Sequence, residues 1–186
     1  MTSTIDEEAR RTAPLALWRY AEEYLRAARH LSGHIDVRCA ESQVPYHVAA
    51  QGIEFALKAF LRARGASMAA LGTDVGHSLP IALKRCEALG LPQLPVRYRA
   101  AIDQVAPCHQ DGQFVHLAAH GTAYPDIDPL VDAGVWVLDQ IAPDVVEHFS
   151  AHLASDQSPS APLLLQRLRA DLSATSGSAQ AASPAA

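Results

Sequence analysis

The stretch 44–64 constrains the fold most, because its apolar side chains recur three and four residues apart over about six helical turns. They predict one wide buried face: Ala49, Ile53, Ala56, Leu57, Phe60 and Leu61. Gly65 follows where a left-handed residue ends many helices. Gly52 costs about 1 kcal/mol relative to Ala inside a helix, which indicates a close helix crossing. Glu54 and Lys58 predict an i,i+4 ion pair worth a few tenths of a kcal/mol.

The same periodicity predicts four more helices and a bend. The expected helices cover 12–33, 78–90, 94–105 and 130–153, with Ser78 as the side-chain cap of the second of these. We expect a loop of small residues over 66–77. Pro107 should interrupt or kink the chain after 105, because proline lacks an N–H and clashes with the preceding turn. Pro143 could bend the last helix.

These elements predict an all-α fold, since helices alternate with short connections and no strand pattern stands out. We expect an antiparallel up-and-down bundle of four to five helices. The domain limits follow from composition: 1–12 is a flexible N-terminus, 13–155 is the bundle, and 156–186 holds a linker, a short amphipathic helix near 163–172 and a disordered tail rich in Ala and Ser.

Composition excludes several classes of protein. The chain has 186 residues and is 49% hydrophobic, enough for one packed core. No apolar run approaches the roughly 20 residues that cross a bilayer, and the charged N-terminus does not resemble a signal peptide. The three cysteines lack a C-x-x-C spacing, which is typical of reduced thiols. We therefore expect a cytoplasmic protein without a membrane contact.

The charges are unevenly distributed along the chain. Residues 1–104 carry a net charge of +2 and residues 105–186 a net charge of −7. Such asymmetry is common on solvated surfaces. It also fits an arginine-bearing surface for a phosphate-rich ligand or an acidic partner, formed by Arg19, Arg26, Arg29, Arg62 and Arg64. The isoelectric point near 5.9 argues against a dedicated nucleic-acid binder.

Histidine is the main residue type left for chemistry, because no P-loop, dinucleotide fingerprint, nucleophile elbow or zinc pattern occurs. Three i,i+4 pairs are present: His30/His34, His116/His120 and His148/His152. Such pairs also arise by chance among nine histidines. His47 together with His116 and His120 resembles the histidine triad of DinB-like metal-binding four-helix bundles. A metal site at these three residues is therefore one hypothesis.

Two other histidines have simpler interpretations. His77 precedes a predicted helix, where its ring would pack on the neighbouring helix. His109 follows Cys108, but a Cys/His nucleophile pair needs hydrogen-bonding reach and a third orienting group. Adjacency in sequence supplies neither, so catalysis by Cys108 is not expected.

The stretch 46–61 (YHVAAQGIEFALKAFL), the following Arg64-Gly65, and 76–79 (GHSL) resemble the HEPN domain, the higher eukaryotes and prokaryotes nucleotide-binding family. That family typically shows E-x-A-L-K-A-hydrophobic-L, a glycine, and then G-H-D-L. Ser78 stands where Asp is usual. The segment 123–126 (AYPD) is similar to the family's R-Y-P element, with Ala123 where Arg is common. The resemblance covers about residues 15–153.

The resemblance implies an antiparallel helical bundle that forms a homodimer. Many members are metal-independent endoribonucleases of toxin–antitoxin and defence systems. Others bind RNA or a nucleotide, or pair with a nucleotidyltransferase or antitoxin-type partner, without catalysis. Lys58, His77 and Tyr124 are the candidate ligand-binding residues that the resemblance suggests, and no cofactor is expected.

The nuclease members carry Arg, four to six residues, then His, late in the bundle. This chain has no Arg between residues 100 and 166, and Arg29-x4-His34 lies on the wrong helix. We therefore expect a non-catalytic HEPN-like binding protein. The alternative is a rearranged nuclease site built from Arg97 or Arg99 with His109 and His116, in which the guanidinium stabilises phosphorane charge and a histidine moves protons.

Overall fold

The computed structural model describes residues 13–33, 42–114 and 126–155. Within these ranges every regular element is a helix, so the predicted all-α helical bundle is confirmed. His116, His120 and Tyr124 lie outside the described residues, as do the segments 1–12 and 156–186. None of the described helices is both long and apolar enough to cross a membrane.

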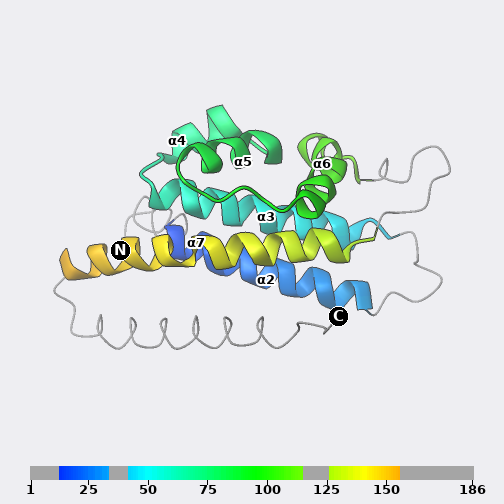
Figure 1. Ribbon diagram of the computed structural model, residues 1–186, viewed down its shortest axis with the longest axis horizontal. Helices are drawn as coiled ribbons and strands as arrows, with labels where there is room; N and C mark the ends of the chain where they lie inside the picture. The colour runs from blue at the N-terminus through cyan, green and yellow to red at the C-terminus, as the bar shows by residue number, and fades with distance from the viewer. Residues whose placement is uncertain (1–12, 34–41, 115–125, 156–186) are drawn as a thin grey trace, which may run out of the picture.

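Three long helices form one layer of the molecule. They are α2 (Pro14–Gly33), α3 (Val44–Ala63) and α7 (Asp128–Ser155). Each of the three packs against the other two, and α2 runs antiparallel to both α3 and α7 (Figure 1). The predicted face of α3 is its contact surface: Ala49, Ile53, Ala56, Leu57, Phe60 and Leu61 are all buried. Burial of this face, more than helix propensity, stabilises the layer.

Two shorter helices, α5 (Leu79–Ala88) and α6 (Val96–Asp111), form a second layer over α3 (Figure 1). They contact α3 and each other, and α6 also reaches α7. This layer carries the chain back to the end of the bundle where α3 began, so α7 points the same way as α3. As a result, the segments just before α5 and at the end of α6 both lie against α3.

The predicted loop over 66–77 is wrong for most of its length. It holds the short helix α4 (Met68–Ala70) and a π-helix, η2 (Leu71–Val75). Ser67 caps α4 by accepting a hydrogen bond from the Ala70 amide at 3.1 Å. Leu71 and Val75 are buried at i,i+4 spacing and anchor the turn on the core. The i,i+4 spacing of these two apolar residues is the sequence feature that indicates a helical turn here.

Of the two outcomes predicted at Pro107, an interruption or a kink, the interruption does not occur. Helix α6 starts at Val96 and continues to Asp111. The buried side chains of Val105, Ala106 and His109 hold the last turns on the bundle despite the missing proline N–H. Gly112, with φ of 67°, ends the helix in the left-handed conformation. His109 consequently lies on a helix that faces α3.

The predicted close crossing at Gly52 is confirmed. A Cβ atom there would lie 2.9 Å from Leu25 Cγ and 3.2 Å from the Ala21 carbonyl oxygen. Gly134 of α7 makes a second close approach, because its Cβ would lie 2.4 Å from Leu25 Cδ2 and 3.1 Å from Ile53 Cγ1. Leu25 therefore fills the space left by two glycines on two different helices.

We expect Gly134→Ala to destabilise the protein. Overpacking of a closed core costs about 1–3 kcal/mol, and the better helix propensity of Ala returns at most about 1 kcal/mol. Leu25 cannot move away freely, because Gly52 confines its other side. Urea unfolding measures the change. Gly33→Ala is the matched control, since nothing lies within 4 Å of that position. Equal effects of the two substitutions would contradict the packing described here.

Candidate functional site

A buried carboxylate, Glu54 of α3, is the centre of the most polar part of the core. Its side chain is only 2% exposed. One oxygen, Oε1, accepts a hydrogen bond from Lys58 Nζ at 2.5 Å. The other, Oε2, contacts His109 Nε2 at 2.6 Å and His77 Nδ1 at 3.1 Å. We call these four residues the Glu54 cluster.

Three different segments bring the cluster together. Helical spacing places Lys58 one turn after Glu54 on α3. His77 lies in the turn between η2 and α5, directly after Gly76, whose φ of 56° favours glycine. His109 comes from the last turns of α6. The cluster thus exists only because the second layer folds back over α3.

The carboxylate is ionised, and this fixes the protons of its partners. Burial alone would raise the pKa of Glu54, but hydrogen bonds from His109 and Lys58, the charge of Lys58 and the hydrogen bond from His77 together lower it from 4.5 to about 2. An ionised carboxylate only accepts hydrogen bonds. His109 therefore donates through Nε2–H and His77 through Nδ1–H.

The environments of the two histidines differ. His77 is exposed over 66% of its side chain, whereas the side chain of His109 is 2% exposed. The second ring nitrogen of His109, Nδ1, is buried and has no hydrogen-bond partner among the described residues. The rings of Phe114 and His47 lie near the imidazole of His109, with centroid-to-centroid distances of 6.0 Å and 6.4 Å. The cluster therefore runs from a sealed interior at His109 to the surface at His77.

Of the site residues predicted from the sequence, the structure brings Lys58, His77 and His109 together around Glu54. It does not bring Arg97 or Arg99 to them. Arg97 lies over the Tyr98 ring and donates to its hydroxyl at 2.6 Å, and Arg99 pairs with Glu87. Both arginines precede His109 by about 15–18 Å along α6. Within one chain they are too distant to act with that imidazole.

The other histidine predictions have separate outcomes. His47 is exposed at the start of α3 and contacts Phe114 edge-on at 5.2 Å. Its predicted metal partners lie outside the described residues. His148 and His152 stack with ring centroids 4.0 Å apart, and His152 donates to the His148 carbonyl oxygen at 2.8 Å. Burial, His152 and Arg62 lower the pKa of His148.

The thiol of Cys108, next to His109 in the sequence, has a raised pKa. Burial and the charge of Asp111 raise the pKa of Cys108. Thiolate, rather than thiol, is the reactive form.

The predicted side-chain cap at Ser78 is absent. Helix α5 does begin directly after Ser78, but the Ser78 hydroxyl makes no capping hydrogen bond.

Sequence reasoning missed the central role of Glu54, which it interpreted as half of a weak i,i+4 pair. The spacing of the apolar residues around Glu54 does indicate that this residue is buried. Ala50, Glu54, Leu57 and Leu61 follow one another at four, three and four residues, so Glu54 lies within the buried stripe. An acidic residue on a buried helix face requires a partner. The sequence could not identify that partner as His109, which is 55 residues away.

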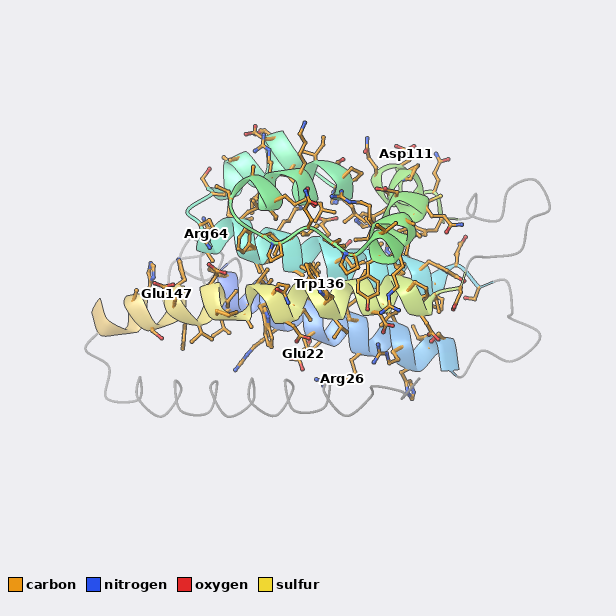
Figure 2. All side chains as sticks on the ribbon, in the orientation of Figure 1. Glu22, Arg26, Arg64, Asp111, Trp136 and Glu147 are labelled. Carbon is orange, nitrogen blue, oxygen red and sulfur yellow. The ribbon has the colours of Figure 1, made fainter. Side chains whose placement is uncertain are left out.

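The expected arginine surface carries mixed charge. Three of its members are neutralised by nearby carboxylates, and two of them, Arg26 and Arg64, are labelled in Figure 2. The pairs are Arg26 with Glu22 at 2.5 Å, Arg29 with Asp132 at 2.8 Å and Arg64 with Asp144 at 2.6 Å. Any phosphate ligand at this surface would have to compete with these carboxylates.

Comparison with known proteins adds no relative from which a role could be taken. No protein-family model, no curated protein and no solved structure matches the chain.

Proposed function

We propose that this protein is a HEPN-like helical bundle that binds a nucleotide unit, free or within RNA, without cleaving it. One observation carries the proposal. Glu54, Lys58 and His77, three polar residues of the stretches that resemble the HEPN domain, meet at a single place in the fold. The resemblance alone did not require them to be neighbours, because His77 is 23 residues from Glu54.

The position of His77 supports an anionic ligand. Its ring is largely exposed, and α5 begins two residues later. The first turn of a helix presents unpaired N–H groups and a partial positive charge, which favour phosphate. The Ser78 hydroxyl makes no hydrogen bond to that first turn. A phosphate or ribose oxygen could therefore bind between the His77 ring and the start of α5.

The electrostatics of the cluster support binding without catalysis. Cleavage of a phosphodiester needs a cation that stabilises the negative charge of the transition state. Lys58 is the cation of the cluster, and its ammonium group is already bonded to Glu54 at 2.5 Å. Arg97 and Arg99 are bound elsewhere on α6. His109 thus has no available cation beside it within this cluster.

Fluorescence polarisation with labelled single-stranded RNA and a fluorescent ATP analogue, in chelator, tests this proposal. We expect the wild type to bind at least one of the two probes, more weakly as salt increases, and to leave the RNA intact. His77→Ala should weaken binding about tenfold. His148→Ala is the matched control, because it removes a histidine from α7, outside the cluster, and should not change affinity.

Three other outcomes would contradict the proposal. RNA cleavage in chelator that His109→Ala abolishes would show an active nuclease, with Arg97 or Arg99 supplied by a second copy. Binding that His77→Ala leaves unchanged would move the ligand away from the cluster. Absence of binding to both probes, with tight binding to a nucleotidyltransferase or antitoxin-type protein, would identify a protein-binding module instead.

Self-association is a second proposed property, favoured by an exposed apolar stripe on α2. Tyr20, Tyr24 and Leu31 are each 37–38% exposed, and both tyrosine rings contact Phe55 of α3, at centroid distances of 6.0 Å and 5.3 Å. Aromatic residues are enriched in the cores of protein interfaces. We propose that a second copy of the chain covers this stripe and forms a homodimer. Sedimentation equilibrium tests this by measuring the mass of the assembly.

The free thiols of Cys86 and Cys108 support a reducing compartment, and we place the dimer in the cytoplasm.

A further inference from the structure

We propose that Glu54, His77 and His109 together bind a divalent transition-metal ion such as Zn²⁺. Each residue offers one ligand atom, and these atoms all lie within 4.8 Å of one another. They come from α3, from the turn before α5 and from the last turns of α6. The site differs from the one expected at His47, His116 and His120, and the inference goes beyond nucleotide binding.

The donor set selects the class of metal. Two imidazoles and one carboxylate form the ligand sets of catalytic zinc centres and of non-haem iron(II) centres, and both leave a coordination position open. Calcium and magnesium prefer six or more oxygen ligands. The cluster supplies two nitrogens and, with Oε1 held by Lys58, one carboxylate oxygen. This composition favours Zn²⁺, Co²⁺ or Fe²⁺.

The distances allow an ion after a small opening of the cluster. Glu54 Oε2 lies 2.6 Å from His109 Nε2 and 3.1 Å from His77 Nδ1. Tetrahedral zinc with bonds of about 2.0–2.1 Å separates its ligand atoms by about 3.3 Å. The His77 contact is close to this value. The His109 contact has to lengthen by about 0.7 Å. Metal binding requires neutral imidazoles, so each ring then carries its proton on the nitrogen that faces away from Glu54, and His109 Nε2 and His77 Nδ1 coordinate the ion.

A second observation concerns the buried imidazole itself. His109 is buried with Nδ1 unpaired among the described residues, whereas nearly all buried polar groups in proteins have a partner. The atom that would bind the ion is Nε2, so Nδ1 would carry the ring proton in the metal-bound state. That N–H has no acceptor among the described residues, which lowers the expected affinity of the site.

Access and charge set the expected affinity. The exposed ring of His77, at 66%, provides an entry path to an otherwise sealed site. Lys58 works against binding, because its ammonium group lies 2.5 Å from the same carboxylate. Removing this positive charge should strengthen metal binding. A cluster that serves only as a hydrogen-bonded core would show no such gain.

Titration of the full-length, untagged protein with Co²⁺, followed by visible absorption and by calorimetry, tests the site. We expect one ion per chain. His77→Ala should weaken binding at least tenfold, and its exposure makes unfolding of this variant unexpected. Lys58→Met should tighten binding several-fold. The double variant His148→Ala, His152→Ala is the control, because it removes the stacked pair on α7, and it should bind as the wild type does.

Two results would overturn the inference. The first is no binding of Co²⁺ or Zn²⁺ by folded wild-type protein. The second is binding that survives His77→Ala but is lost in the double variant, which would assign the ion to the histidine pair of α7. Nucleotide binding is measured in chelator, so the proposed function and the metal site can each fail without the other.

Discussion

Glu54→Ala should lower the free energy of unfolding by about 3–5 kcal/mol, the usual cost of breaking a buried ion pair by removing one partner. The carboxylate is the common acceptor for Lys58, His77 and His109. Without it, the mostly buried side chain of Lys58, 15% exposed, loses its counter-ion. His109 loses its hydrogen bond in a sealed environment as well. Urea denaturation followed by circular dichroism measures the loss.

Glu22→Ala is the matched control for this experiment. Glu22 forms an i,i+4 pair with Arg26 at 2.5 Å, the same distance as the pair of Glu54 with Lys58, but at the exposed surface. Its loss should cost less than about 0.5 kcal/mol. The double variant Glu54→Leu, Lys58→Met should recover much of the lost stability, because apolar side chains remove the uncompensated charge. A cost for Glu54→Ala as small as that for Glu22→Ala would show that the cluster is not an ion pair sealed in the core.

Acid should destabilise the protein through the same carboxylate. The pKa of Glu54 is about 2 in the folded protein, against 4.5 for an unperturbed glutamate. The unfolded chain therefore binds the proton more readily, and stability must fall as the pH decreases. The contribution of Glu54 is fully present above about pH 5 and is lost progressively toward pH 2. Its size is about 3 kcal/mol, at 1.36 kcal/mol for each pKa unit.

Comparison with Glu54→Gln isolates this contribution from the other acidic groups. Asp74, for example, has a pKa lowered by its hydrogen bonds with Thr73 and Arg85, but it is exposed and remains in both proteins. We expect the difference in unfolding free energy between wild type and Glu54→Gln to shrink by about 3 kcal/mol between pH 6 and pH 2. A difference that is constant over this range would mean that Glu54 titrates alike in the folded and unfolded chains.

The fold could be predicted because local patterns determine it. The apolar stripe of α3, the proline near the start of α5 and the left-handed Gly65 are readable from short segments. Errors arose where tertiary packing overrode a local rule. Buried side chains on both sides of Pro107 keep α6 intact through the proline, and a buried Leu71 and Val75 turn an expected loop into a π-helix.

The site was predicted only in its parts. Lys58 and His77 were identified from the HEPN resemblance, and His109 as a histidine available for chemistry. Their common partner was not, because the Glu54 carboxylate joins residues 23 and 55 positions apart through the contact between two layers of helices. Sequence spacing describes one helix face at a time. It contains no information about which distant ring will lie against a buried carboxylate.

The ionisation of Glu54 in the folded protein tests the central claim most directly. The carboxyl carbon of Glu54 can be followed by NMR as the pH is lowered, with Glu54→Gln to assign its resonance. We expect the folded protein to keep Glu54 ionised to about pH 2, with His109 Nε2–H as one of its hydrogen-bond donors. A Glu54 resonance that titrates near 4.5, in a protein that remains folded, would contradict a buried carboxylate held by Lys58 and two histidines.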